Sequence, residues 1–308
     1  MNTSSATSKS RKQGVLKGVL AVAVLATAIP TFGASQASAA SKEVDAFRQA
    51  ATIEKVFLEK PTFSNLSNIS PSAPLNPAQV GTVELLFGYQ QAQTLDIANK
   101  SIQQYGVAVQ KTYKSKADQQ LIKDIMLQSE TLRKTTDDFA YYLKLAWRND
   151  FNFHKSKEYK SKYSTYVKDY TTLNASLKKF VRSADEPQAK MTAAANIPNM
   201  FNAMVFRLED RHPEYSRSKD RQDLQAGLLA EHRTLALAKG FLNAAPKTAE
   251  QQKLLKSYST FEATSQNMLK SMQANKWAFD FKLLPTYQKQ RDDLVKTGKA
   301  SLAKTPWK

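Results

Sequence analysis

The stretch YKSKYSTYVKDYTTLNASLKKF, residues 159–180, decides the fold class of this 308-residue chain. Its large apolar and aromatic side chains recur alternately four and three positions apart, at Tyr159, Tyr163, Tyr166, Tyr170, Leu173, Leu177 and Phe180. This spacing places side chains on one face of an α-helix, whereas a β-strand would divide them between two faces. Residues 154–183 are therefore predicted to form a long helix with one buried stripe.

The same period recurs along most of the chain. Residues 117–148, 219–244 and 248–275 each carry apolar side chains at alternating spacings of three and four. Asn76-Pro77 is typical of a helix start, and this helix is predicted to run through about Lys111. Each stripe needs a partner, because burying a Leu or Phe is worth roughly 1.5–3 kcal/mol.

Glycine is scarce, with six residues after Gly33. Sheet-rich folds need glycines in their turns, and phosphate-binding loops need them in clusters. No window alternates with period two as well as these segments follow the helical period. The sequence therefore predicts an all-α fold, an antiparallel bundle of about five to seven long helices.

The first 39 residues have the form of a secretory signal peptide. Four basic residues precede the apolar segment Val19–Ile29, and Ala37-Ser38-Ala39 fits the rule for cleavage sites. The alternative is a retained anchor, but eleven apolar residues fall short of the roughly 20 that span a bilayer. We expect cleavage and export to a periplasm, a cell wall or the medium, with no transmembrane segment in the mature chain.

The exported part is predicted to have two regions. Residues 40–78 hold a short amphipathic helix, 42–60, which packs loosely or serves as an arm. It is followed by 61–78, a linker with four prolines and no charged residue. Residues 79–308 form the bundle domain, in which prolines interrupt the segment 184–218.

Basic residues outnumber acidic ones by 18, and removing residues 1–39 leaves a net charge of +14. Residues 282–308 contribute +5 and residues 155–182 contribute +6. The latter include Lys155, Lys157, Lys160, Lys162, Lys168, Lys178, Lys179 and Arg182. Such a run is either a solvated, solubilising face or a surface that attracts anions.

The tyrosines between these lysines allow two interpretations. Tyr159, Tyr163 and Tyr166 could line a groove that stacks on sugars or clamps an extended ligand. They could instead form a bundle seam whose hydroxyl groups reach polar partners. The seam is favoured, because the stripe continues into Leu173 and Leu177.

No catalytic or metal-binding residue is predicted, and no cofactor. The chain has no cysteine, which excludes disulfides, thiolate metal sites and cysteine nucleophiles. His154, His212 and His232 lie on different predicted elements, and Glu231-His232 lacks the spacing of a zinc protease motif. The polar run Glu209–Glu214 is interpreted as a solvated helix end, because consecutive residues do not point to one side.

Two segments resemble a known family. DDFAYYLKLAWRNDFNFHKSKEYKSKYSTYVKDYTTLNASLKKF (Asp137–Phe180) and DLQAGLLAEHRTLALAKGFLNAA (Asp223–Ala245) are similar to the YiiG-like family of bacterial envelope proteins. The resemblance implies a helical, exported protein that is often lipid-anchored and has no established activity or catalytic residues. The chain departs from the family in lacking the cysteine that would carry a lipid and in its proline-rich segment.

The favoured function is non-catalytic binding by a basic face. The expected partner is an anionic envelope polymer, a lipid surface or an acidic protein, because six uncompensated charges would give a salt-sensitive affinity. Nucleic acid fits the charge, but the signal peptide leads away from it and no nucleic-acid-binding motif accompanies the lysines. The alternative is a hydrolase of envelope glycans or phosphoesters, whose carboxylates would converge from different helices.

Overall fold

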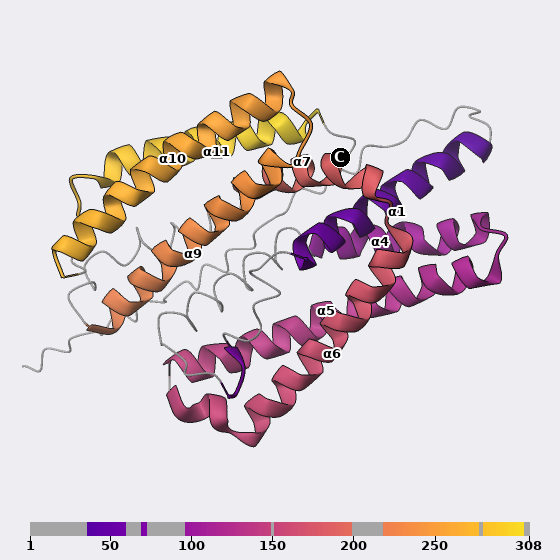
Figure 1. Cartoon of the computed structure of the whole chain (residues 1–308), viewed down its shortest axis with the longest axis horizontal. Helices are drawn as coiled ribbons and strands as arrows, with labels where there is room; N and C mark the ends of the chain where they lie inside the picture. Colours follow the sequence, from indigo (N-terminus) through magenta and orange to yellow (C-terminus); the bar gives the residue numbers. More distant parts are fainter. Residues whose placement is uncertain are drawn as a thin grey trace, which may run out of the picture. The chain divides into compact units, whose positions relative to one another are not determined.

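The computed structural model describes residues 36–59, 69–72, 96–148, 151–198, 218–276 and 280–304 (Figure 1). Over these residues the protein has eight α-helices, short 3₁₀ turns and no β-strand. The described helices belong to one unit, residues 36–308. The predicted all-α fold is therefore confirmed.

The helices form two groups that we name for their order in the chain. The amino-terminal helix group consists of α1 (Gln36–Leu58), α4 (Asp96–Thr112), α5 (Lys116–Arg148) and α6 (Lys157–Phe180). The carboxy-terminal helix group consists of α7 (Glu186–Asn196), α9 (Ser218–Asn243), α10 (Ala249–Ala274) and α11 (Leu284–Leu302). Within each group, helices that follow one another closely in sequence pack side by side as hairpins, among them α5 with α6 and α10 with α11.

The expected helix boundaries hold to within a few residues where the structure describes them. α6 begins at Lys157, because the Ser156 side chain accepts a hydrogen bond from the Tyr159 backbone N–H, and a 3₁₀ turn, η3 (Phe151–Lys155), precedes it. Thr248 caps α10 in the same way. The predicted buried stripe of α10 is confirmed, since all its members are buried: Leu254, Tyr258, Phe261, Ser265, Met268 and Met272.

The seam between α5 and α6 is aromatic. The ring of Phe139 on α5 lies 5.5 Å from that of Tyr159 and 5.3 Å from that of Tyr166, centroid to centroid. These contacts follow from the spacing of α6, which aims successive turns of its stripe at one neighbouring helix. The Tyr159 hydroxyl donates to the Ile69 carbonyl at 2.8 Å, and the Tyr170 hydroxyl donates to the Leu58 carbonyl. The hydroxyl groups of these two tyrosines thus find backbone acceptors at the edge of a mostly apolar seam.

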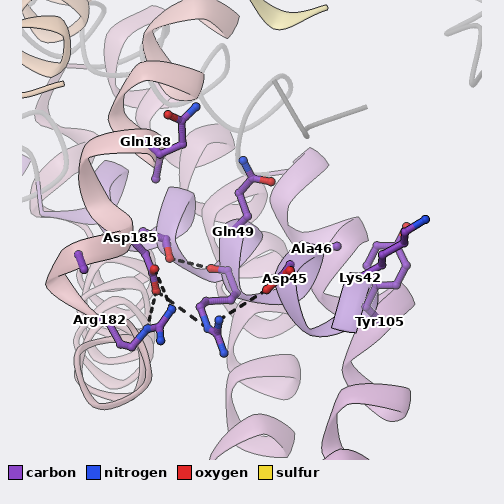
Figure 2. Close-up of a pocket in the computed structure, with 12 residues that line it drawn as sticks. Lys42, Asp45, Ala46, Gln49, Tyr105, Arg182, Asp185 and Gln188 are labelled. Carbon is purple, nitrogen blue, oxygen red and sulfur yellow. Dashed lines mark hydrogen bonds and ion pairs between the residues drawn. The ribbon is translucent and has the colours of Figure 1, made fainter. Parts of the chain in front are cut away.

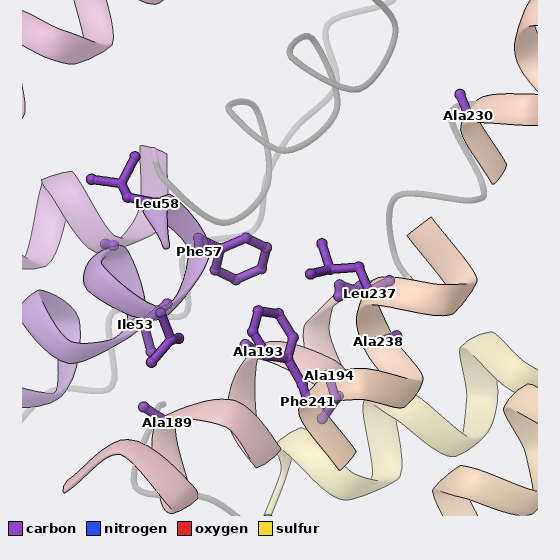
Figure 3. Close-up of a cluster of buried hydrophobic side chains, with 14 of the residues drawn as sticks. Ile53, Phe57, Leu58, Ala189, Ala193, Ala194, Ala230, Leu237, Ala238 and Phe241 are labelled. Carbon is purple, nitrogen blue, oxygen red and sulfur yellow. The ribbon is translucent and has the colours of Figure 1, made fainter. Parts of the chain in front are cut away.

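α1 is not the loosely packed helix that its sequence suggested. Every residue from Ala50 to Leu58 is buried, because α1 contacts α4, α6 and α7. Figure 3 shows Phe57 and Ile53 of α1 meeting Ala193 of α7 and Phe241 of α9. The rings of Phe57 and Phe241 lie 5.2 Å apart, edge to face. The expectation of a loose arm was wrong, and α1 belongs to the core that both groups share.

A chain of ion pairs accompanies this packing. Lys55 of α1 lies 2.7 Å from Glu186 of α7 and 2.8 Å from Glu59, with 9% of its side chain exposed. Lys178 of α6 lies 3.8 Å from Glu59. A buried ammonium group is costly to leave unpaired, so these carboxylates make the burial of Lys55 tolerable.

Two glycines allow close helix contacts. A Cβ atom added at Gly298 of α11 would lie 2.7 Å from the backbone oxygen of Ala195 on α7. One added at Gly106 of α4 would lie 2.4 Å from the sulfur of Met126, a flexible side chain of α5. By contrast, a Cβ at Gly227 of α9 would meet nothing within 4 Å.

Several expectations fall on residues that the structure does not describe. They are the signal peptide up to residue 35, most of the linker 61–78, the start of the helix expected from Asn76, and the interrupted segment from residue 199 to 217. Of the linker, Ile69 is described and is buried as the acceptor of the Tyr159 hydroxyl. Of the segment 184–218, Pro187 lies in the first turn of α7, where its missing N–H costs no helical hydrogen bond.

Candidate functional site

Six of the seven lysines singled out in the sequence are exposed, and we call the surface that they form the α6 basic face. Lys157, Lys168 and Lys179 lie on the side of α6 opposite its buried stripe, and Lys160 and Lys178 lie on its flank. All five are exposed, and Lys155 is exposed just before the helix. From Lys157 to Lys179 the helix rises about 33 Å, at 1.5 Å per residue.

Three members of the predicted set have acidic neighbours: Lys162, Lys178 and Arg182, the last of which pairs with Asp185. Lys162 donates to Asp138 of α5 and its Nζ lies 5.5 Å above the ring of Tyr142. Lys178 is the one that pairs with Glu59. Within the described part of the chain, Lys155, Lys157, Lys160, Lys168 and Lys179 make no ion pair with an acidic side chain. These five charges are open to an external anion.

The predicted tyrosines do not share that face. Tyr159 and Tyr166 are fully buried in the seam with α5, and Tyr163 is partly buried there. Burial raises the pKa of both Tyr159 and Tyr166 above the ordinary value of a phenol. Their positions agree with the seam interpretation, because neither buried ring is available to stack on a ligand from solvent.

Arg182, the last predicted residue, lies just beyond the carboxyl end of α6 and lines a pocket (Figure 2). The pocket has a volume of about 680 Å³ and opens between α1, Tyr105 of α4, the 3₁₀ turn η4 (Ser183–Asp185) and the start of α7. Figure 2 shows Arg182 and Asp185 on one side, Asp45 and Gln49 of α1 beside them, and Gln188 above. The Arg182 guanidinium donates two hydrogen bonds of 3.0 Å to the Asp185 carboxylate.

Arg48 of α1 is a mostly buried pocket residue whose side chain has unused hydrogen-bonding capacity. Its nitrogens lie 3.6 Å from Asp45 and 4.0 Å from Asp185, both beyond hydrogen-bond distance. It makes no side-chain hydrogen bond with a described residue, although only 23% of its side chain is exposed. A guanidinium has five N–H donors, and none of those of Arg48 is hydrogen-bonded to a described side chain.

Sequence reasoning missed this pocket because its parts are distant in the chain. The spacing Arg182–Asp185 does predict a local ion pair, but nothing in the sequence joins it to Arg48, since α1 was expected to pack loosely. The contact depends on α1 lying against α7.

Two buried glutamates form separate polar sites. In the amino-terminal helix group, Glu54 of α1 accepts a hydrogen bond of 2.9 Å from Ser129 of α5, and its other oxygen has no partner. Burial raises the pKa of Glu54 to about 8, against the opposing effect of Ser129. The group is therefore neutral over most of the physiological pH range.

In the carboxy-terminal helix group, Glu231 of α9 accepts hydrogen bonds from Ser265 of α10 and Tyr287 of α11. Burial raises the pKa of Glu231 to about 7, while both donors and the charge of Arg291 lower it. His232 lies beside this cluster, with its Nε2 3.1 Å from Ser265 Oγ, and burial lowers the pKa of His232. The sequence placed Glu231 and His232 next to each other but gave no sign of the serine and tyrosine that join them.

The remaining described histidine, His154, lies away from Glu231 and His232, in the seam between α5 and α6. His154 is buried on η3, with its ring edge-on to Tyr159 at 6.5 Å. His212 and the run Glu209–Glu214 lie outside the described residues. Within the described residues, no group of three acidic or histidine side chains is placed to hold a metal ion. Among the same residues, no helix combines the length and apolar character needed to cross a bilayer.

No family model, curated protein or solved structure matches this chain. The resemblance to the YiiG-like family therefore stays a prediction.

Proposed function

We propose that this is an exported, non-catalytic binding protein that holds an anionic polymer of the cell envelope on its α6 basic face. One observation carries the proposal: five exposed lysines without acidic partners among the described residues lie on or beside the outward side of one helix. An elongated row of charges suits a chain of repeated anionic groups better than a single small ion.

The expected affinity follows from charge alone. Each lysine near an anionic surface contributes roughly 1 kcal/mol, and salt screens exposed charges over about 8–10 Å. The buried tyrosines add no stacking surface, so binding should be electrostatic and weakly selective among polyanions. The second basic stretch, residues 282–308, includes α11 and has part of its charge balanced, since Arg291 pairs with Asp292 and Lys304 with Glu250.

The test compares two triple variants. Lys157→Gln, Lys160→Gln and Lys168→Gln remove three charges from the α6 basic face, and Lys253→Gln, Lys256→Gln and Lys270→Gln remove three exposed charges from α10 as the matched control. With polyphosphate as the probe at low salt, the first variant should bind about a hundredfold more weakly, and the control should bind nearly as the native chain does.

The assay has outcomes that contradict the proposal. Equal losses in both variants would mean that only total charge matters, and binding that persists in molar salt would exclude an electrostatic contact. Preference for acidic phospholipid vesicles or an acidic protein would assign the face to one of those partners. Shortening of the polymer during the experiment would favour the hydrolase alternative.

Export has its own test. The signal-like residues 1–39 predict that the secreted protein starts near Ala40, which mass spectrometry of a culture fraction measures directly. A secreted chain that keeps Met1 would contradict cleavage.

A further inference from the structure

The pocket beside α1 carries an inference independent of the α6 basic face. We infer that it binds a small polar molecule through a single anionic group, a carboxylate or a phosphate, held by Arg48 and Arg182. Its volume of about 680 Å³ lies in the range of small-ligand sites, roughly 300–1,000 Å³, and exceeds what a bare oxyanion would fill.

The charges of the lining favour an anion. Three basic side chains, Lys42, Arg48 and Arg182, face two carboxylates, Asp45 and Asp185, which leaves one positive charge. A carboxylate ligand would balance the lining, and a phosphate monoester, with a charge of about −1.5 to −2 at pH 7, would more than balance it.

Arg48 supplies the contact point. Its donors are without a hydrogen-bonded acceptor among the described residues, and its side chain is mostly withdrawn from water. A planar guanidinium binds carboxylate or phosphate oxygens in a two-pronged arrangement, and such charge-assisted bonds are the strongest in proteins. Arg182 uses Nε and Nη2 in its hydrogen bonds to Asp185. Its other terminal nitrogen, Nη1, is left to donate to the same oxyanion.

The rest of the lining suits a polar body. Gln49 and Gln188 offer amide donors and acceptors, and Tyr105 offers an aromatic surface with a hydroxyl. Thr52 forms part of the buried floor, and its hydroxyl is already bonded to the Arg48 carbonyl at 2.7 Å. A sugar acid or sugar phosphate has both the charge and the hydroxyl groups that these residues would bind.

Calorimetric titration of the full chain with glucuronate, glucose 1-phosphate and glucose tests the inference. The two anionic sugars differ in the source of the charge, and glucose lacks it. At least one of the anionic sugars should bind tenfold or more tightly than glucose. Binding of neither one, or equal binding of glucose, would overturn the proposal.

Variants locate the site. Arg48→Gln and, separately, Arg182→Gln should weaken binding of the anionic sugar roughly ten- to hundredfold. Asp45→Asn should strengthen it severalfold, because Asp45 is an exposed competitor 3.6 Å from Arg48. Arg233→Gln, an exposed position on α9, is the control and should change nothing.

These variants also separate failure of this site from failure of the proposed function. The triple substitution on the α6 basic face should leave binding of the anionic sugar unchanged. Circular dichroism checks that Arg48→Gln folds. If it does not fold, Arg182→Gln tests the site instead, because the Arg182 side chain is exposed. Unchanged affinity in a folded Arg48→Gln or in Arg182→Gln would overturn the inference.

Discussion

The amino-terminal and carboxy-terminal helix groups each enclose one glutamate that a serine of a neighbouring helix contacts, but they treat it differently. Glu54 has one donor, Ser129, and an oxygen without a partner, and its pKa is raised to about 8. Glu231 has two donors, Ser265 and Tyr287, and feels the charge of Arg291, and its pKa is raised to about 7. The comparison teaches that burial sets the direction of the shift, while the number of donors aimed at the carboxylate limits its size.

The largest predicted effect is the pH dependence caused by Glu54. Between pH 4.5 and about 8 the carboxyl group of Glu54 keeps its proton in the folded chain but loses it in the unfolded chain. Its contribution to the free energy of unfolding is therefore fully present below pH 4.5 and is lost as pH rises through about 8. Its loss costs about 1.4 kcal/mol per pH unit in that interval. Glu54→Gln should remove this slope, as measured by urea unfolding from pH 5 to pH 9.

Glu231→Gln is the matched variant for the other group, and the slope that it removes should end near pH 7. If Glu54→Gln leaves the pH dependence of the unfolding free energy unchanged, Glu54 is ionised in the folded protein and the contrast between the two sites fails.

The second prediction concerns close helix packing. Gly298→Ala should destabilise the protein by about 1–3 kcal/mol, because the new methyl group would meet the backbone oxygen of Ala195, which can move only with α7. Gly106→Ala should cost less, since the side chain of Met126 can rotate away. Thermal unfolding of the two variants measures the difference, and an equal cost would contradict it.

The third prediction concerns a variant that should bring the pKa of Glu231 closer to that of Glu54. Tyr287→Phe removes one donor from Glu231, so the pKa of Glu231 should rise towards that of Glu54 and stability should fall by about 1–2 kcal/mol near neutral pH. Tyr258→Phe is the control, because it removes a hydroxyl bonded to the Ala194 carbonyl and leaves Glu231 untouched. Only Tyr287→Phe should extend the pH-dependent interval upwards. A matching pH profile in both variants would show that Tyr287 does not stabilise the charge.

The smallest predicted effect has the opposite sign. Gly227→Ala in α9 should stabilise the protein by about 0.5–1 kcal/mol, because a methyl group there meets nothing within 4 Å and restricts the unfolded chain. The same substitution at Gly298 destabilises, so two glycines of one helix group should respond in opposite directions. A loss of stability at Gly227 in thermal unfolding would mean that helix propensity does not decide the outcome there.

The helices themselves were predictable from the sequence because their information is local. The spacing of Leu254, Tyr258 and Phe261 is sufficient to define the buried face of α10, and the structure buries all three. α1 was misjudged for a reason that is also physical. Its burial depends on α4, α6 and α7 surrounding it, and no pattern within residues 42–60 records those neighbours.

The candidate sites were predictable only in part, for the same reason. All lysines of the α6 basic face except Lys155 lie on one helix, so the helical period places them together. Arg48 and Asp185, or Glu231 and Tyr287, meet across helices distant in sequence. Predicting such pairs requires knowing which helices pack together. A single sequence carries no direct signal of that packing.

The position of α1 bears on how the molecule can be divided. α1 is the first helix of the amino-terminal helix group, yet its Phe57 packs against Phe241 and its Lys55 pairs with Glu186, both of the carboxy-terminal helix group. A fragment beginning at α7 would therefore expose an aromatic ring and leave an acidic side chain without its counter-ion. Because α1 packs against helices of both groups, we expect the two groups to unfold together in one cooperative step.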